Sequence, residues 1–159
     1  MHSKCHIYGL TTILCVLLLC SCKDNVYFTA HHHFEQSVWY SEDTIRIPVA
    51  QFLTYEQIDS GTVMNLSISL RHSDKYKYRT LYVEAMLTDT TGTVRQDTLR
   101  FDISARGGDG FRYRTQVKEW TQFVPLDSNR YTISITHIMK QNPLEGISDL
   151  IVGCDSEEK

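Results

Sequence analysis

The chain has 159 residues, a length that suits a single domain. Hydrophobic residues make up 42% of it and charged residues 22%, values near those of ordinary globular domains, which excludes a wholly disordered chain and a polytopic membrane protein. The formal net charge of −3 gives no electrostatic reason to expect nucleic acid as a partner.

The N-terminal segment has the organisation of a secretory signal. A short start that includes Lys4 precedes an apolar run over residues 7–19, which is too short for a membrane-spanning helix of about 20 residues. The run ends in Leu19-Cys20-Ser21-Cys22, which resembles a bacterial lipobox because a small residue and a cysteine follow it directly. We therefore predict a lipoprotein signal peptide over residues 1–21 and a lipid on Cys22. An ordinary cleaved signal with incidental cysteines is the alternative.

Lipidation would fix the location of the mature chain. Two or three acyl chains, palmitate among them, give durable membrane anchoring, whereas a single chain binds only reversibly. We expect a cell-envelope protein that is anchored in the outer membrane, with residues 22–30 as a tether that runs into a first strand.

Once the signal is removed and Cys22 is acylated, Cys154 is the one remaining thiol. Its place in a polar C-terminal tail, residues 154–159, marks it as incidental.

Four stretches in the body of the chain alternate apolar and polar residues, which is the pattern of half-buried strands. The segments between them are rich in Gly, Asp, Ser and Asn, which favour turns. The residues on the apolar faces are Leu66, Ile68 and Leu70; Leu81, Val83, Ala85 and Leu87; Leu99, Phe101 and Ile103; and Tyr131, Ile133, Ile135 and His137. Only residues 51–59 offer one or two helical turns.

About eight strands with one apolar face each must cover one another to exclude water. We therefore predict an all-β domain over residues 31–153, built as an antiparallel β-sandwich. A jelly roll is one form of such a sandwich, and an eight-stranded barrel is the alternative fold. Near the end of the domain, residues 142–146 form a tight turn or loop, and Ile147, Leu150 and Ile151 are expected to pack over one open end of the sandwich.

The run His31-His32-His33 is the most evident candidate for metal chemistry. In a strand, His31 and His33 project from one face, and Glu35 comes next on that face. A metal site needs a third and usually a fourth converging ligand, and three consecutive histidines are more often simply solvated. We therefore expect no metal site and no cofactor.

A cationic, tyrosine-bearing segment joins two of the predicted strands. Residues 71–79 carry four cations and two tyrosines against one acid. Such a mixture suits recognition, since tyrosine buries a large amphipathic area and cations pair with acidic partners. The candidate partner contacts are Arg71, Tyr76, Tyr78 and Arg79. The structural alternative is that the tyrosines cover the sandwich edge while the charges discourage edge pairing.

Trp39, Tyr40 and Trp120 are candidates for an aromatic platform that binds sugar, although aromatic residues also fill sandwich cores as a matter of course. The sequence contains no Gly-x-Ser-x-Gly elbow, no His-Glu-x-x-His helix and no paired-cysteine zinc pattern. We therefore expect no enzymatic activity. A glycan-binding envelope lipoprotein is the alternative function, and a hydrolase has the least support.

A set of short motifs resembles the gliding motility lipoprotein GldH family of Bacteroidetes, and with the lipobox it covers most of the mature chain. The motifs are Leu70-Arg71, Tyr76-Lys77-Tyr78-Arg79-Thr80-Leu81-Tyr82, Asp97-Thr98-Leu99, Tyr131-Thr132-Ile133, Ile138-Met139 and Asn142-Pro143-Leu144-Glu145-Gly146-Ile147-Ser148-Asp149. The resemblance implies a non-enzymatic component of an envelope assembly associated with gliding motility and type IX secretion. Its partners would be the membrane, through the N-terminal lipid, and envelope proteins.

Overall fold

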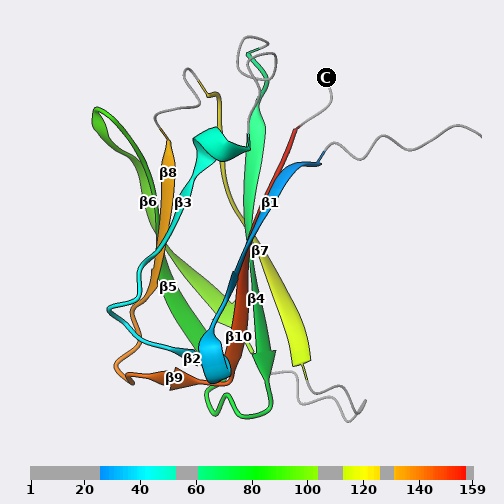
Figure 1. The fold of residues 1–159 in the computed structure, drawn as a ribbon, viewed down its shortest axis with the longest axis vertical. Coiled ribbons are helices and arrows are strands. Elements are labelled where there is room, and N and C mark those ends of the chain that lie inside the picture. The colour runs from blue at the N-terminus through cyan, green and yellow to red at the C-terminus, as the bar shows by residue number, and fades with distance from the viewer. Residues whose placement is uncertain (1–25, 53–60, 104–112, 126–130, 157–159) are drawn as a thin grey trace, which may run out of the picture.

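The computed structural model describes residues 26–52, 61–103, 113–125 and 131–156. Within these ranges two four-stranded antiparallel sheets pack face to face, as the ribbon in Figure 1 shows. The first sheet has the order β1 (Val26–His33), β10 (Ile147–Ser156), β4 (Met64–Ser73), β7 (Tyr113–Phe123). The second has the order β3 (Ile45–Pro48), β8 (Thr132–His137), β5 (Thr80–Asp89), β6 (Gly92–Asp102). Two short strands, β2 (Val38–Trp39) and β9 (Leu144–Glu145), pair separately, and the 3-10 helices are η1 (Glu35–Ser37) and η2 (Val49–Gln51).

The strands pair as they would in one long antiparallel hairpin that is then wound into two sheets. The first strand pairs with the last, β2 with β9, β3 with β8, β4 with β7 and β5 with β6. Rolling then adds the contacts β10–β4 and β8–β5, which complete each sheet. Two sheets of four strands with this connectivity are a jelly roll. The predicted all-β sandwich is confirmed, and the barrel alternative is wrong because the strands belong to two separate sheets.

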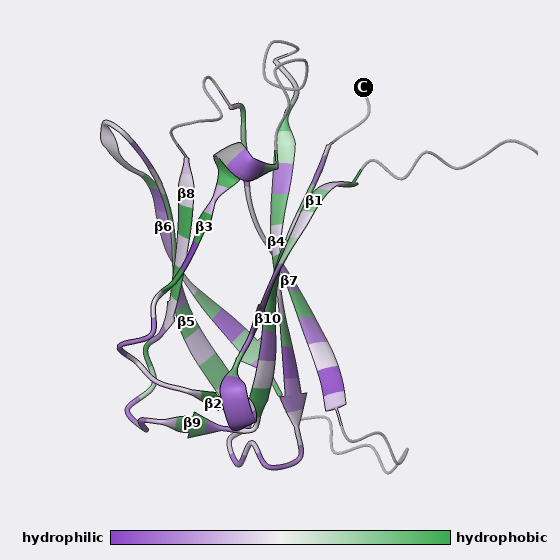
Figure 2. Cartoon of the chain, viewed as in Figure 1, coloured by the Kyte–Doolittle hydropathy of each residue, from purple (hydrophilic) through white to green (hydrophobic). Residues whose placement is uncertain are grey.

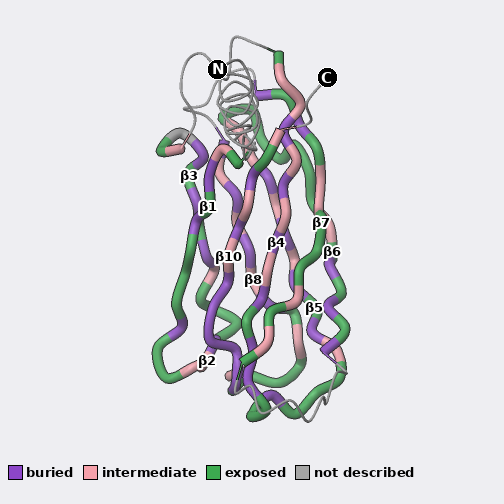
Figure 3. Tube along the Cα trace, turned by 90° about the vertical axis from the view of Figure 1, so that its right-hand side faces the viewer, coloured by how far each residue is buried: buried purple, intermediate pink, exposed green. Residues whose placement is uncertain are grey.

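The core lies between the two sheets and is supplied by the alternating stretches. Every residue predicted on their apolar faces is buried, and Ile68, Leu70, Val83 and Ile135 have no exposed surface. Figure 2 shows the alternation as hydrophobic bands along β4, β5 and β8, and Figure 3 shows the same strands alternating between buried and less buried residues. Fully burying one such side chain contributes about 1.5–3 kcal/mol, so the alternating stretches contribute strongly to the stability of the fold.

The C-terminal part of the chain differs from its prediction. Ile147 and Leu150 are fully buried, but they lie in β10, a central strand of the first sheet, and do not cover an end of the sandwich. The same strand continues through Cys154 to Ser156, so the C-terminal tail begins later than residue 154. At the other end of the domain, β1 begins at Val26, within residues 22–30, where the tether is expected to run into a first strand, and it continues to His33. The signal peptide, Cys22 and residues 53–59 of the predicted helical turns lie outside the described residues.

The strand register defines two ends of the sandwich. Val26 and Asn65 both pair with Asp155 at one end, which we call the tether end because the chain enters the sandwich there. His33 and Arg71 both pair with Asp149 at the opposite end, which we call the far end. The segment that joins β4 to β5 and the segment after β8 also lie at the far end (Figure 1).

Candidate functional site

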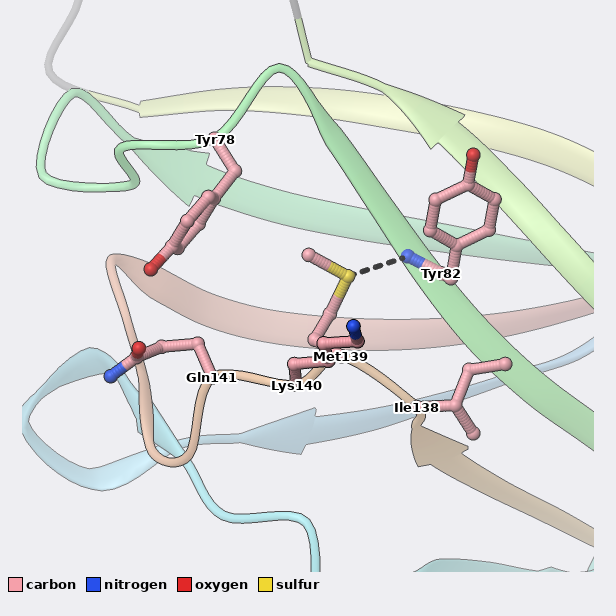
Figure 4. A pocket seen from close by; sticks show the side chains of 6 residues that line it. All are labelled: Tyr78, Tyr82, Ile138, Met139, Lys140 and Gln141. Atoms are coloured by element: carbon pink, nitrogen blue, oxygen red, sulfur yellow. Dashed lines mark hydrogen bonds between the residues drawn. The ribbon is translucent and has the colours of Figure 1, made fainter.

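A shallow pocket lies at the far end of the second sheet. It encloses about 420 Å³ and is lined by Tyr78, Tyr82, Ile138, Met139, Lys140 and Gln141. Figure 4 shows these side chains, which come from the β4–β5 segment, from β5 and from the segment after β8. Tyr78, Tyr82 and Ile138 remain 42%, 39% and 47% exposed, so three large side chains with apolar surface face the solvent together. We call these six residues the far-end groove.

The outer wall of the groove depends on a buried tyrosine. Tyr76 is buried, its hydroxyl donates a hydrogen bond to the Thr80 carbonyl over 3.0 Å, and burial raises the pKa of that hydroxyl. The Tyr78 ring packs edge-on against the Tyr76 ring, with 5.5 Å between centroids. Tyr76 therefore positions Tyr78, while its own ring is not available to a partner.

Gly146 holds the β4–β5 segment close to β9. Its φ of +87° is unfavourable for residues with a side chain, and a Cβ at this position would lie 2.9 Å from the Cα of Tyr76. The Ser73 amide donates to the Gly146 carbonyl, and the Gly146 amide donates to the Ser37 carbonyl, each over 2.8 Å. The backbone of three segments meets here, which fixes the path of the chain toward Tyr78.

The floor of the groove is an extension of the β5–β8 pairing. The Ile138 amide donates to the Tyr82 carbonyl over 3.1 Å, as in a regular ladder. The Tyr82 amide, however, donates to the Met139 Sδ over 3.5 Å. Figure 4 shows this contact as a dashed line, with the Met139 side chain between Tyr78 and Tyr82. A thioether is a weak acceptor, so the Tyr82 amide is poorly satisfied.

A polar cluster lies on the outer face of the first sheet, also toward the far end. His31 Nε2 and His33 Nδ1 lie 3.2 and 2.9 Å from one carboxylate oxygen of Asp149. Arg71 Nη1 lies 3.9 Å from the other oxygen, and its guanidinium lies 4.9 Å from the centre of the Tyr113 ring. Burial alone would raise the pKa of Asp149, but hydrogen bonds with His33 and Ser148 and the nearby imidazoles hold that pKa below its usual value.

The histidine run is therefore engaged by a carboxylate. His31 and His33 do share a face of β1, as the pattern predicts, but β1 ends at His33 and Glu35 begins a 3-10 helix instead of following on that face. In the described ranges, no group of three His, Cys, Asp or Glu side chains is placed to hold a metal ion.

The structure separates the four candidate contacts in residues 71–79. Tyr78 lines the groove and the exposed Arg79 follows it in sequence, while Tyr76 lies in the core. Arg71 lies on the outer face of the first sheet, beside Asp149 and Tyr113.

The two tryptophans of the candidate aromatic platform pack into or against the core, as the alternative reading of the sequence expected, while Tyr40 is exposed. Trp39 has no exposed surface, and its Nε1 donates to the Asp43 carbonyl over 3.0 Å. Trp120 packs partly buried against the core, and its Nε1 donates to Asp97 over 3.1 Å. A glycan site that uses Trp39 is wrong, because the indole fills the interior of the sandwich.

Comparison with known proteins decides the family. The GldH lipoprotein family matches residues 26–153, which is most of the chain. The chain belongs to the GldH lipoprotein family. A curated relative, the gliding motility lipoprotein GldH homolog of Christiangramia forsetii, is 26% identical over 151 residues, which cover 87% of this chain and 88% of that protein. The resemblance of the short motifs is thereby confirmed, and the GldH-family chain is a gliding motility lipoprotein with a lipid-anchored place in the cell envelope.

Solved structures resemble the GldH-family chain only in outline. The CBM22-1 xylan-binding domain of Paenibacillus barcinonensis Xyn10C is 5% identical, with a TM-score of 0.42, over 88% of this chain and 99% of that domain. The structure of tomato aspermy virus is 11% identical, with a TM-score of 0.37, over 97% of this chain and 95% of the viral chain. Likeness at this level carries no argument about function.

Among the residues that the structure describes, no helix has the length and apolar character needed to cross a membrane.

Sequence reasoning missed most of the groove in the GldH-family chain. Tyr82 lies between the core residues Leu81 and Val83, so the period of two already places it on the outer face of β5. Ile138 and Met139 follow His137, where the alternation of β8 ends. The sequence pattern does not predict the pairing register of β5 and β8, which brings Ile138 beside Tyr82.

Proposed function

We propose that this GldH-family chain is a non-enzymatic interaction component of a gliding motility and type IX secretion-associated assembly, anchored through Cys22 in the outer membrane. The single observation that carries the proposal is the far-end groove, an exposed amphipathic pocket at the end of the sandwich opposite the tether. Aromatic residues that keep one apolar face and one polar tip are characteristic of protein interfaces. None of the six lining residues has a carboxylate, imidazole or thiol that could act with Lys140 in acid–base catalysis.

The position of the groove supports a role in contact with other envelope proteins. The eight residues of β1 lead away from the tether end over about 26 Å, since a strand rises about 3.3 Å per residue. A lipid on Cys22 would therefore hold Val26 near the membrane and direct the groove away from it. Such an orientation leaves the groove accessible to a partner protein.

Affinity capture from the native envelope tests this proposal. The full lipoprotein, tagged at its C-terminus, is compared with the double variant Tyr78→Ala/Tyr82→Ala. Both rings are substantially exposed, so the fold is expected to persist while recovery of envelope proteins falls at least tenfold. The matched control is Arg71→Ala/Tyr113→Ala, which removes one tyrosine of similar exposure and the candidate contact Arg71 from the other sheet. If the control variant loses the envelope proteins and the groove variant retains them, the surface that binds the partner lies on the first sheet and not in the groove.

A glycan ligand is the second candidate, and it is favoured by two tyrosines that line one pocket together with the Gln141 amide. Aromatic faces and amide groups are suited to sugar rings and hydroxyls. A glycan array probed with the full lipoprotein tests this candidate. Binding that Tyr78→Ala and Tyr82→Ala abolish would support it, and an array without hits would dismiss it.

A further inference from the structure

We infer that the far-end groove binds an acidic peptide segment of an envelope protein, with an apolar side chain of the peptide in the place of Met139 and a peptide oxygen on the Tyr82 amide. This inference rests on the proposed function and names the chemistry of the partner. Three features of the groove carry it: the cations around it, which form no ion pair among the described residues, the partners of three nearby acids, and the weak contact at its floor.

The cations around the groove form no ion pairs with the residues that the structure describes. Lys140 lines the groove, while Lys77 and Arg79 flank Tyr78 and are exposed. In the described part of the chain, no ion pair joins these three side chains to a carboxylate, although other surface arginines are paired. A cationic rim of this kind on a chain with a net charge of −3 is electrostatically complementary to an acidic partner.

Three acids near the groove have partners other than the cations of the rim, while a fourth, the exposed Asp74, lies in the same segment as Lys77 and Arg79. Glu84, two residues beyond Tyr82 on β5, accepts a hydrogen bond from Gln96 over 2.8 Å. Asp102 pairs with Arg100 over 2.7 Å. Glu42 accepts hydrogen bonds from Ser41 and Asn142, each over 3.0 Å, and the bond from Asn142 contributes most to lowering its pKa. Hydrogen bonds from neutral donors leave Glu84 and Glu42 charged, but neither carboxylate is in an ion pair with Lys77, Arg79 or Lys140 among the described residues, so these cations are open to a partner.

Met139 occupies the place that we assign to a peptide side chain. It lies between the two tyrosines and packs partly buried against the core, and its sulfur is the acceptor that the structure gives to the Tyr82 amide (Figure 4). Methionine is unbranched and adapts readily to a changed environment, so its side chain can move aside. A peptide carbonyl or carboxylate oxygen is a far stronger acceptor than a thioether. A bound peptide would exchange the weak N–H···S contact for an N–H···O bond, while one of its apolar side chains packs between Tyr78, Tyr82 and Ile138.

Two matched peptides test the charge. One is an acetylated octapeptide with a Leu-Phe pair flanked by three glutamates on each side, and the other replaces all six glutamates by lysines. Affinities are measured by fluorescence polarisation with the full lipoprotein in detergent micelles. We expect the acidic peptide to bind at least tenfold more tightly at 50 mM salt, with the difference shrinking at 500 mM. Equal affinities would overturn the inference.

Charge variants of the protein test the place of binding. Lys140→Glu is expected to weaken binding of the acidic peptide about tenfold, and Arg79→Glu about fivefold. The control, Lys118→Glu, changes an exposed lysine of β7 on the other sheet and is expected to leave affinity within twofold. Equal losses in all three variants would overturn the inference, because they would show a general charge effect.

The floor contact has its own readout. The amide resonance of Tyr82 is expected to shift downfield when the acidic peptide binds, as an N–H···O bond replaces N–H···S. Met139→Ala empties the space between the tyrosines and is expected to raise affinity severalfold. Unchanged or weaker binding would show that Met139 does not occupy the place of a peptide side chain, and would overturn the inference. Failure of these peptides alongside groove-dependent capture from the envelope would overturn the acidic-peptide inference and leave the proposed function standing. Neutral oligosaccharides that bind where both peptides fail would replace it with the glycan candidate.

Discussion

Two histidines lie in the core with ring nitrogens that meet no hydrogen-bond partner among the described residues: Nε2 of His72 and both nitrogens of His137. Burial lowers the pKa of each imidazole; at His137 the Trp39 backbone and the charges of Glu42 and Asp43 oppose that effect without cancelling it. A protonated imidazole at either place would be poorly compensated in the core. The sandwich therefore holds both side chains in the neutral form.

Acid is expected to destabilise the fold through these two side chains. The unfolded chain takes up protons below a histidine pKa of about 6.5, while the folded chain takes them up only at lower pH. The free energy of unfolding should be level from about pH 8 to about 7 and should fall as the pH decreases through 6.5. Urea titrations at pH 7.5 and 5.0 measure the difference. The variant His137→Phe should show a smaller difference in unfolding free energy between the two pH values. A wild-type chain that is more stable at pH 5 than at pH 7.5 would contradict the conclusion that the two imidazoles are buried in the neutral form.

Cys154 is expected to be chemically inert in the folded chain. It lies in β10 with 1% of its surface exposed, and burial raises its pKa to about 12. Because the thiolate is the reactive form, iodoacetamide should modify Cys154 only after unfolding. Peptide mapping by mass spectrometry, with and without urea, follows this site separately from the other cysteines. Rapid native labelling would show that β10 opens at its C-terminal end.

The junction at Gly146 shows how one glycine can determine the position of a neighbouring segment. Gly146→Ala is expected to destabilise the chain by about 3 kcal/mol, because a left-handed conformation is combined with a close approach to the backbone of Tyr76. Gly61→Ala is the matched control: its φ is +61°, but no atom lies within 4 Å of the added methyl group, so the cost should be about 1 kcal/mol. Chemical denaturation measures both. Equal costs would mean that backbone conformation alone accounts for the effect.

The strands that the sequence predicts well are those with one buried face. Leu66, Ile68 and Leu70 recur at a period of two because β4 is covered on one side only, and the same holds for β5 and β8. Strand β10 is harder to recognise, since its register shifts between Ile147 and Asp149 and two polar residues there are buried. Burial of Ser148 and Asp149 depends on Arg71 and His33, which lie on other strands.

Strand β7 shows a second reason why sequence patterns fail. It is an edge strand, and the pairing skips Trp120 between Thr121 and Glu119, so Trp120 is the extra residue of a β-bulge. The bulge interrupts the alternation, and most residues of β7 are partly or fully exposed. The indole of Trp120 reaches Asp97 on β6 of the opposite sheet, a contact that no local pattern encodes. The groove was missed for the same reason, because it depends on which strands become neighbours.

Rolling the chain into a jelly roll places the tether and the groove at opposite ends, and this arrangement makes a prediction about orientation. The four residues from Cys22 to Asn25 can span at most about 14 Å, so a lipid on Cys22 would keep Val26 close to the bilayer. The groove lies about the length of β1 farther away. Residues at the two ends should therefore meet different surroundings in the native envelope.

Photo-crosslinking from each end tests that arrangement. A benzophenone amino acid is placed at Val26 or at Ile138, which are 58% and 47% exposed, so neither substitution disturbs the core. We expect adducts with lipid from Val26 and adducts with envelope protein from Ile138, each at least severalfold above the other position. Cys22→Ala should abolish the lipid adducts from Val26, because the lipid provides the anchor. Lipid adducts from Ile138 as abundant as those from Val26 would show that the sandwich lies flat on the membrane, with its groove against the bilayer and not directed toward a partner.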